Sequence, residues 1–579
     1  MSNLIDSHDV ISFDVFGTLL ARYVPSPHDV FRYMGQSLEI DDFCSARLKA
    51  EQLARRRFGT EKSPEISLDE IYEVLSVLVP GHGVKPDDER VYEKGLAYAD
   101  QAFKMVAETA RQKGKRVIGI SDTYLNKSEV SGQLEASGIV LDEVYTSCES
   151  RRDGLGKFNG RMFTHVADKE GVAPQRILHF GESVITDVAN ALARGITAIH
   201  VQPHLECLEQ DEAPFIDRGS EDGSFTADLI LGQIAARLPH VDPEESDLYG
   251  FGFNMCGPLL FGFCDYIAKR SKRDEVDHLL LPADQSLIIE HALNILQLSV
   301  PGCSIVDVKY VLSGGLPESP KAEGELLKRK LEKLIRQSAQ NVAIVDIGCN
   351  LPPVGALDAV GRSRLHWYCL GLQKDSGDRE GLSAYLFDGL SAADFDVAAT
   401  NGVELFKLLF SNPDTEPKSS GDKNGATNRI RSLAVQDIHR GALDFLRKIA
   451  PLKDALDRRE LTDYNRLCFL RLISNPTELE YCALAGVPYL LYQDQDSWTF
   501  IGSVWKFRPV PSRPLPTVQN LANERQLENY DLLLPTAIKE LSLRDDIGQM
   551  NWRRIMYRHP LKISYWNSIR RYLRRSGNN

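Results

Sequence analysis

Short apolar runs alternate with helical patterns over residues 9–201, an order that predicts a parallel sheet with helices packed against it. Buried strands are expected at residues 9–20, which include a turn, and at 115–122, 142–147, 176–183 and 196–201. Helices are expected at 160–171 and 186–195. The fold class predicted for this part is α/β, with a Rossmann-like core.

The first two predicted strands are separated by residues 27–113, which carry helical patterns and no strong strand signal. The segments FCSARLKAEQLARRRF and SLDEIYEVLSVLV are examples, and Ser67 and Glu70 predict a capping box at the start of the second one. We therefore expect a helical cap, inserted at about residues 21–112, to cover the edge of the sheet.

The pattern after residue 202 predicts a second α/β domain with strands at 277–284 and 341–348. Residues 203–247 are acidic and contain DRGSEDGS, which is typical of a linker. Residues 411–428 are rich in turn formers, and most of the remaining chain is helical. The predicted division of the chain is 1–205 for the core with its cap, 206–247 for the linker, 248–410 for the second domain and 411–579 for a mostly helical region.

Composition limits the kinds of binding partner and the cellular location that can be expected. The chain has 579 residues and a net charge of −13, which argues against bulk nucleic-acid binding. Its ten cysteines form no CxxC pair, and the N-terminus carries no signal-peptide pattern, so a cytoplasmic location is expected. The apolar run 248–268 contains Asn254, Pro258 and Asp265, which favours a buried helix over a membrane span.

The end of the chain, WRRIMYRHPLKISYWNSIRRYLRRSGNN, is basic and contains aromatic residues. A solvated terminal helix is the favoured interpretation. Peripheral association with an anionic surface is the alternative.

Polar residues that can carry chemistry lie at or just after the predicted strands. Asp14 follows the first strand, Ser121 ends the second, and Glu182 and Asp187 follow the strand at 176–183; Lys157 precedes a predicted helix. Because ligands of open parallel sheets bind at the carboxyl ends of the strands, these side chains are expected to converge. Thr18, Arg22 and Asp122, which lie beside them, are candidate substrate-binding residues.

The motifs FDVFGTL at 13–19, ISDTYL with its serine, Lys157 and GESVITD at 181–187 resemble the haloacid dehalogenase (HAD) superfamily. The segments LLARYVPSPHDVF, ISLDEIYEVL and ILHFGESVITDVANALARGI resemble, more narrowly, the large predicted HAD hydrolases encoded among bacterial surface-polysaccharide genes. The resemblance is specific over residues 1–202 and looser over GFGFNMCGPLLFGF, HLLLPADQSL, AIVDIGCN and IHRGALDFL. That group often has an LARDG-like segment where this chain has LPADQSL, and a Ser-Arg pair near the segment that here is YVLSGGLP.

The resemblance implies a phosphohydrolase or phosphotransferase in which Asp14 attacks phosphorus and forms an aspartyl phosphate. It implies Mg²⁺ between Asp14, the backbone carbonyl of Phe16, Glu182 and Asp187. Ser121 would hydrogen-bond a phosphate oxygen, and Lys157 would neutralise charge. The implied substrate is a small sugar phosphate or a nucleotide-sugar-type compound, with polysaccharide-synthesis proteins as partners.

Phe16 occupies the position where most phosphatases of this superfamily have an aspartic acid, which protonates the leaving oxygen. Such general acid–base help contributes roughly 10²–10⁴-fold to the rate. Three interpretations stay open: a phosphohydrolase whose leaving group needs little acid help, a binding or scaffold protein of polysaccharide assembly that has lost turnover, and a 2-haloacid dehalogenase, in which halide leaves without a proton.

The second α/β region offers Asp284 and Asp346, each at the end of a predicted strand, as candidates for a second ligand site. Capping of turns and helices is the favoured interpretation of both. A transferase role for this region has no donor-binding motif to support it, because neither a Walker loop nor a GxGxxG following a strand is present.

Overall fold

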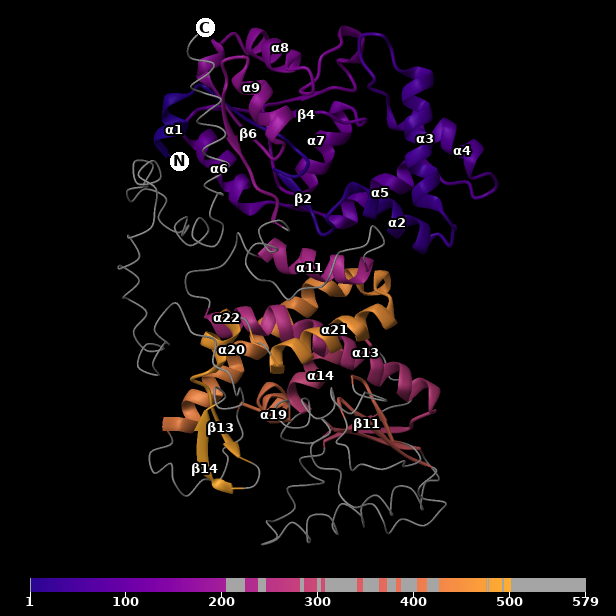
Figure 1. Ribbon diagram of the computed structural model, residues 1–579, viewed down its shortest axis with the longest axis vertical. Coiled ribbons are helices and arrows are strands. Elements are labelled where there is room, and N and C mark those ends of the chain that lie inside the picture. The colour runs from indigo at the N-terminus through magenta and orange to yellow at the C-terminus, as the bar shows by residue number, and fades with distance from the viewer. Residues whose placement is uncertain are drawn as a thin grey trace. The chain divides into compact units, whose positions relative to one another are not determined.

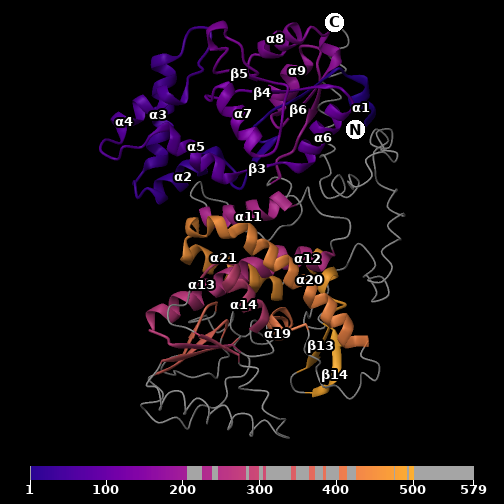
Figure 2. The ribbon, with the colours of Figure 1, turned by 180° about the vertical axis from the view of Figure 1, so that it is seen from behind.

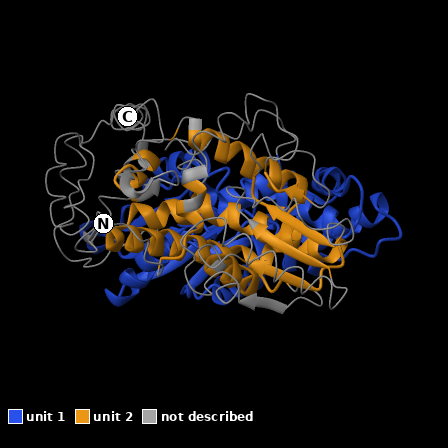
Figure 3. Cartoon of the chain, turned by 90° about the horizontal axis from the view of Figure 1, so that it is seen from below, with its two compact units in different colours: residues 1–213, 219–243, 530–579 blue, residues 214–218, 244–529 orange. Residues whose placement is uncertain are grey.

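The structure is a computed structural model in which the chain divides into two compact units (Figure 1, Figure 3). Unit 1 contains the described residues up to 237, and unit 2 contains those from 246 onward. The described residues are 2–204, 224–237, 246–281, 286–298, 304–307, 341–346, 364–371, 382–386, 403–413, 426–474, 476, 478–491 and 494–500.

Unit 1 is built on a five-stranded sheet with the order β5-β4-β1-β6-β7. The neighbouring strands pair in parallel throughout. The strands are β1 (Val10–Phe13), β4 (Arg116–Ser121), β5 (Glu143–Thr146), β6 (Ile177–Gly181) and β7 (Thr197–His200). The predicted parallel sheet is confirmed, and each strand lies within a predicted range.

Helices cover both faces of this sheet because successive strand residues point to opposite sides. Ile118 and Ile120 of β4 pack in one core cluster with Phe163 of helix α8 (Arg161–Glu170). On the other face Phe180 of β6 stacks on Phe13 and contacts Phe103 of helix α6 (Gln101–Gln112). The result is a three-layer α/β/α sandwich.

A group of helices is inserted into the chain after β1. A two-stranded antiparallel ribbon of β2 (Leu20–Arg22) and β3 (Ala97–Ala99) forms its entry and exit. The helices between them lie together to one side of the sheet in both views (Figure 1, Figure 2). They are α2 (Pro27–Ser37), α3 (Phe43–Phe58), α4 (Leu68–Leu78) and α5 (Pro86–Leu96).

The predicted capping box at Ser67 and Glu70 is confirmed at the start of α4. Helix α6 follows β3 and packs on the core sheet, although the range of about 21–112 expected for the cap included it. Helix α11 (Phe225–Arg237) lies within the segment expected to be a linker, and its Phe225 stacks on Tyr33 of α2. The predicted domain boundaries themselves stay predictions.

The remaining described elements of unit 1 precede β1 or connect the strands. They are α1 (Ser2–Ser7), α7 (Lys127–Ala136), η1 (Arg151–Asp153), η2 (Pro174–Arg176), η3 (Val184–Ala189) and α9 (Asn190–Leu192). The helix expected at 186–195 is divided between the π-helical turn η3 and α9.

Unit 2 contains a second five-stranded sheet, with the order β12-β11-β10-β8-β9 and parallel pairing. Its strands are β8 (His278–Leu281), β9 (Ser304–Asp307), β10 (Val342–Asp346), β11 (Leu365–Cys369) and β12 (Leu382–Ala384). The predicted strands at 277–284 and 341–348 correspond to β8 and β10. Asp346 ends β10, whereas Asp284 lies outside the described residues.

The apolar run 248–268 is a buried helical stretch, as predicted, formed by α12 (Asp247–Phe251), η5 (Gly252–Cys256) and α13 (Gly257–Arg273). No described helix is long and apolar enough to cross a membrane. The other elements of unit 2 are α14 (Ser286–Ile295), α19 (Val403–Phe410), α20 (Ala426–Ile449), η8 (Ala450–Ala455), α21 (Arg458–Ser474), α22 (Glu478–Leu484), β13 (Pro488–Leu491) and β14 (Asp494–Phe500). The basic C-terminal end lies outside the described residues.

Candidate functional site

The side chains singled out in the sequence gather at the carboxyl edge of the unit 1 sheet. Asp14 directly follows the central strand β1, and Ser121 is the last residue of the adjacent strand β4. Glu182 directly follows β6 on the other side of β1, and Asp187 lies in the first turn of η3. The sheet order therefore brings three separate chain segments to one edge.

Lys157 connects two of these segments through its ammonium group. Its Nζ lies 2.5 Å from Asp14 Oδ1 and 2.5 Å from Asp187 Oδ1. All three side chains are almost entirely buried, with exposed fractions of 4%, 6% and 1% for Lys157, Asp14 and Asp187. A buried ammonium between two carboxylates is a strong electrostatic link, because little water screens it.

The loop after Asp14 turns back on itself within a few residues. The amides of Leu19 and Leu20 both donate to the carbonyl of Val15, and Thr18 Oγ1 donates to Asp14 Oδ2 at 3.3 Å. Gly17 sits in this turn with φ +89°, a conformation that favours glycine. A Cβ atom on Gly17 would lie 1.9 Å from Glu182 Oε2, so the absence of a side chain lets the Glu182 carboxylate approach the loop.

Asp122 positions the loop that carries Lys157. Its two carboxylate oxygens accept the backbone N–H groups of Lys157, at 2.8 Å, and Phe158, at 2.9 Å. The side-chain amide of Asn190 donates to the carbonyl of Lys157 at 2.7 Å. These bonds fix the backbone from which the lysine reaches Asp14, and the substrate-binding role expected for Asp122 stays a prediction.

Asp187 is held by two groups besides Lys157. The backbone N–H of Ser183 donates to its Oδ2 at 2.9 Å, and His179 Nε2 lies 3.4 Å from its Oδ1. His179 is fully buried, and its Nδ1 lies 2.8 Å from Ser12 Oγ. Burial lowers the pKa of His179, so the neutral ring donates from Nε2 to Asp187 and accepts from Ser12 at Nδ1.

Sequence reasoning did not select His179. The signal was present, because a histidine in the otherwise apolar strand segment RILHFG must find polar partners when the strand is buried.

The carboxylates differ in their protonation. Burial is the main cause that raises the pKa of Asp14 to about 7; Lys157 opposes it, while Asp187 and Glu182 add to it. Burial would also raise the pKa of Asp187, but Lys157 and His179 hold it below its usual range. Lys157 keeps its charge because the two carboxylates raise its pKa against the effect of burial. Asp187 therefore anchors the ammonium, and Asp14 is the group whose charge responds near neutral pH.

Phe16 and Arg22 form the side of the site nearest the cap. The Arg22 guanidinium lies over the Phe16 ring, 5.2 Å from its centroid. Its Nε and Nη2 donate to the two carboxylate oxygens of Glu93 in α5, at 3.0 and 2.9 Å. Burial would lower the pKa of Arg22, but Glu93 raises it well above the usual range. Arg22 thus stays charged beside the aromatic ring, and Glu93 is a second residue that sequence reasoning missed.

The fit of the site to a divalent cation depends on the oxygens that it can offer. Among the described residues, no group of three or more His, Cys, Asp and Glu side chains is arranged to hold a metal ion. Lys157 Nζ instead lies between the Asp14 and Asp187 oxygens. The donor set nevertheless suits Mg²⁺, because carboxylate and carbonyl oxygens are its preferred ligands. The position of Glu182 against Gly17 brings a further carboxylate to the Asp14 loop.

Solved structures with a similar fold are HAD-family enzymes. The HAD family enzyme BT-2542 from Bacteroides thetaiotaomicron is 15% identical over 34% of this chain and 95% of that chain, with a TM-score of 0.27. The L-2-haloacid dehalogenase PA0810 is 17% identical over 34% of this chain and 86% of that chain, also with a TM-score of 0.27. Wild-type BT-2542 in complex with magnesium and inorganic phosphate is 15% identical over 34% of this chain and 95% of that chain, with a TM-score of 0.26.

No protein-family model matches the chain, and no curated protein matches it. The structural likenesses concern the fold of about one third of the chain. They assign no activity to it, and the roles of the site residues stay predictions.

Proposed function

We propose that unit 1 is a HAD-type phosphohydrolase or phosphotransferase that acts on a small phosphorylated metabolite through an aspartyl phosphate on Asp14. The observation that carries the proposal is the buried bridge from Asp14 through Lys157 to Asp187, at 2.5 Å on both sides. It presents one carboxylate at the carboxyl edge of a parallel sheet with a fixed cation beside it. That arrangement suits attack on an anionic, phosphate-bearing centre.

Asp14 Oδ2 or Oδ1 would form the new O–P bond while the bond from phosphorus to the leaving oxygen breaks. Water, or an acceptor alcohol in a transferase, then displaces the aspartate and regenerates Asp14. Lys157 would offset charge on the phosphoryl oxygens, and Ser121 would donate a hydrogen bond to one of them. Mg²⁺ held by Asp14, the Phe16 carbonyl, Glu182 and Asp187 would supply Lewis-acid stabilisation of that charge.

The kind of leaving group follows from Phe16, which cannot move a proton. A leaving group that is stable without protonation suits the site, as in an acyl phosphate, a diphosphate or an anomeric sugar phosphate. Arg22, beside the Phe16 ring and charged, can face an anionic leaving group. The sugar-phosphate class, the polysaccharide context, the protein partners and the cytoplasmic location rest on the sequence resemblance alone.

Hydrolysis by the Asp14→Asn variant tests this proposal. Release of phosphate from acetyl phosphate and from sugar 1-phosphates is measured with Mg²⁺ for the wild type and the variant. We expect activity in the wild type and a loss of at least about 10³-fold in the variant, because the amide is not a nucleophile. Equal rates for the two proteins on every substrate would reject the proposal.

Phe16→Asp separates a weak enzyme from a scaffold with the same fold. The introduced carboxylate would stand beside Arg22 and could protonate a leaving oxygen, so we expect phosphatase activity on alkyl phosphates to rise by roughly 10²-fold or more. An absence of gain, together with no Mg²⁺ binding in calorimetry, would favour a binding or scaffold protein instead.

A further inference from the structure

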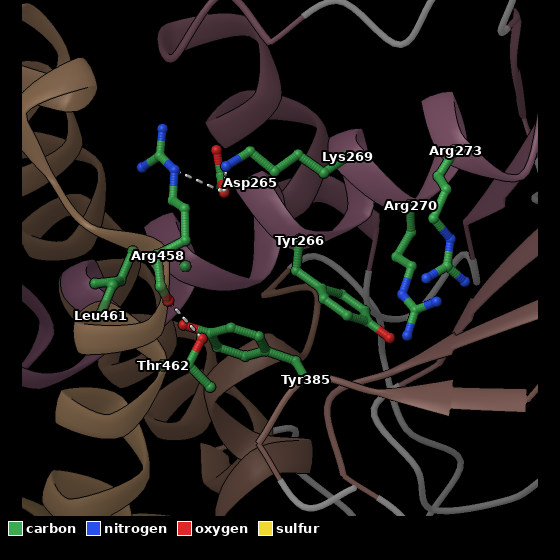
Figure 4. A pocket seen from close by; sticks show the side chains of 10 residues that line it. Asp265, Tyr266, Lys269, Arg270, Arg273, Tyr385, Arg458, Leu461 and Thr462 are labelled. Atoms are coloured by element: carbon green, nitrogen blue, oxygen red, sulfur yellow. Dashed lines mark hydrogen bonds and ion pairs between the residues drawn. The ribbon is translucent and has the colours of Figure 1, made fainter. Parts of the chain in front are cut away.

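A pocket lined by residues of unit 2 alone has a volume of about 240 Å³. It lies between the C-terminal half of α13, the residue that follows strand β12 and the first turns of α21 (Figure 4). Tyr385 is the β12 contribution, so the pocket reaches the carboxyl side of a strand in a parallel sheet. Ligands of such sheets bind on that side.

Basic side chains dominate the charge of this pocket. Its lining contains four cationic side chains and one carboxylate, Asp265, and the cations are Lys269, Arg270, Arg273 and Arg458. The buried Asp265 carboxylate lies 3.4 Å from Lys269 Nζ and 3.2 Å from Arg458 Nε, so one acid is shared by two bases. Arg273 Nε lies 3.0 Å from Asp274 Oδ1, so this arginine is paired as well. The excess of positive charge that an anion would balance therefore comes from Arg270 and from the sharing of Asp265.

Two of the arginines keep donors available. Arg270 lies over the Tyr266 ring, 5.5 Å from its centroid, and within the described part of the chain it pairs with no carboxylate. Arg458 Nη1 is buried and has no hydrogen-bond partner among the described residues. Buried donors without partners are rare, because each costs the free energy of removing its water. A ligand oxygen could accept a hydrogen bond from such a donor.

Aromatic rings form the rest of the wall. Tyr266 and Tyr385 contact each other with ring centroids 5.6 Å apart, and Figure 4 shows them between the Arg270–Arg273 pair and the Arg458–Asp265 pair. Tyr385 is fixed, since Asn465 Nδ2 donates to its hydroxyl at 2.9 Å and the Cα of Gly262 leaves room for that hydroxyl. Rigid rings beside arginines suit a ligand that combines a ring with an anionic group.

We propose that this pocket binds a small phosphate-bearing metabolite, with its phosphate on Arg270 and its ring against Tyr266 and Tyr385. The volume of about 240 Å³ equals that of roughly eight waters at about 30 Å³ each, which admits a phosphorylated monosaccharide. The assignment is independent of the Asp14 chemistry, because every residue that carries it belongs to unit 2.

Isothermal titration calorimetry with glucose 1-phosphate, in EDTA and in an Asp14→Asn background, tests the proposal without turnover. We expect binding with a Kd of about 1 mM or tighter, and a loss of at least about tenfold in Arg270→Gln, because a charged donor to phosphate is removed. Uncharged glucose should bind at least about tenfold more weakly than its phosphate. Equal affinity for the two sugars would overturn the proposal.

Arg440→Gln is the matched control. Arg440 also lies over a tyrosine ring, that of Tyr249 at 5.0 Å, but it belongs to α20 and does not line the pocket. We expect its affinity to stay within about twofold of the parent. Lys269→Gln, whose side chain is 57% exposed, serves as a second pocket variant if Arg270→Gln does not fold. Unchanged affinity in both pocket variants, or no binding by the parent, would reject the site.

Discussion

Asp14 is a buried carboxyl group, and its ionisation lowers the free energy of unfolding. Since burial raises its pKa to about 7, the native chain binds a proton between about pH 4 and 7 that the unfolded chain has released. The free energy of unfolding therefore falls as pH rises through this window. The same ionised carboxylate is the proposed nucleophile, so the group that destabilises the fold above pH 7 is the one that the chemistry requires.

Asp14→Asn should raise the free energy of unfolding at high pH. In EDTA at pH 8 we expect the variant to be more stable than the wild type by on the order of 2 kcal/mol, because the amide needs no charge at the buried position. The difference should shrink toward pH 4, where Asp14 is protonated. Calorimetric unfolding at several pH values measures it. The exposed Asp168 of α8 gives the control Asp168→Asn, and a gain that is the same at pH 5 and pH 8 would contradict the explanation.

Asp122 acts on Lys157 through the backbone, so its replacement should affect the reaction more than binding. In Asp122→Ala the N–H groups of Lys157 and Phe158 lose their acceptors, and the ammonium loses its fixed position. We expect kcat for acetyl phosphate to fall by roughly 10²-fold with a smaller change in KM. Steady-state kinetics measure both quantities.

The control for Asp122 is Asp142→Ala. Asp142 Oδ2 also accepts a backbone N–H, that of Val117 at 2.8 Å, but the bond lies at the opposite end of strand β4 from Ser121. A similar loss of stability with unchanged kcat is expected. If both variants lose the same fraction of kcat, the effect is one of folding and the positioning role is wrong.

The sequence predicted the residues of the site better than their contacts. Asp14, Ser121, Glu182 and Asp187 could be placed because strand ends fix their edge of the sheet, and Lys157 does reach Asp14. The pairing of Arg22 with Glu93 could not be predicted, because the two are 71 positions apart in the chain and meet only through the ribbon and the cap. Arg22 was expected to face substrate, and that role stays a prediction.

At the scale of elements, the cap is organised around one buried ion pair. Arg47 of α3 is fully buried, and its guanidinium donates to both oxygens of Glu89 in α5, at 2.6 and 2.8 Å. The hydroxyls of Tyr72 in α4 and Tyr124 in the core also donate to Glu89, at 3.0 and 2.9 Å. Glu89 therefore joins three cap helices to the loop after β4.

Glu89→Gln should loosen the cap much more than the sheet. The change leaves the buried Arg47 charge with only the more exposed Glu51 carboxylate, 3.1 Å from its Nη1, and removing one partner of a buried pair costs up to about 3–5 kcal/mol. We expect faster hydrogen exchange in residues 27–96 and little change in β1, β4 and β6. Mass spectrometry of peptic fragments after deuteration measures the difference.

Glu73→Gln is the matched control for the cap. Glu73 pairs with Arg57 at 2.9 Å, but the two side chains are 54% and 61% exposed. Surface ion pairs contribute about 0–1 kcal/mol, so exchange should stay close to that of the wild type. A cap that loosens equally in both variants would show that burial of the Arg47–Glu89 pair is not what stabilises it.

The elements of unit 1 were easier to predict than those of unit 2. The five strands of its main sheet are apolar runs bounded by turns, and all five fall within predicted ranges. The short ribbon strand β3 was missed, because residues 27–113 were expected to be helical. In unit 2, strands β9, β11 and β12 were missed. Their sequences, SIVD, LHWYC and LSA, are short and carry polar residues, so local pattern does not distinguish them from loops. Only pairing makes them strands: β9 pairs with β8, β11 with β10, and β12 with β11.

At the scale of the whole molecule, each unit has its own five-stranded sheet and its own apolar core among the described residues. The unit 1 core joins β1, β4 and β6 to α8, whereas in unit 2 the buried Phe445 of α20 packs against Phe253 of η5. Each unit also carries its own candidate site, one with a buried carboxylate and one with an excess of basic side chains. Their stabilities can therefore respond to different substitutions.

Calorimetry should resolve this organisation as two unfolding transitions. Asp14→Asn at pH 8 should raise the midpoint of one transition, and Phe445→Leu should lower the midpoint of the other by several degrees, because a buried aromatic ring is lost. In the double variant both shifts should appear unchanged, as expected for substitutions that share no contacts. A single transition that both substitutions move would mean that the two cores unfold as one cooperative body, and the separation inferred from their sheets would then be wrong.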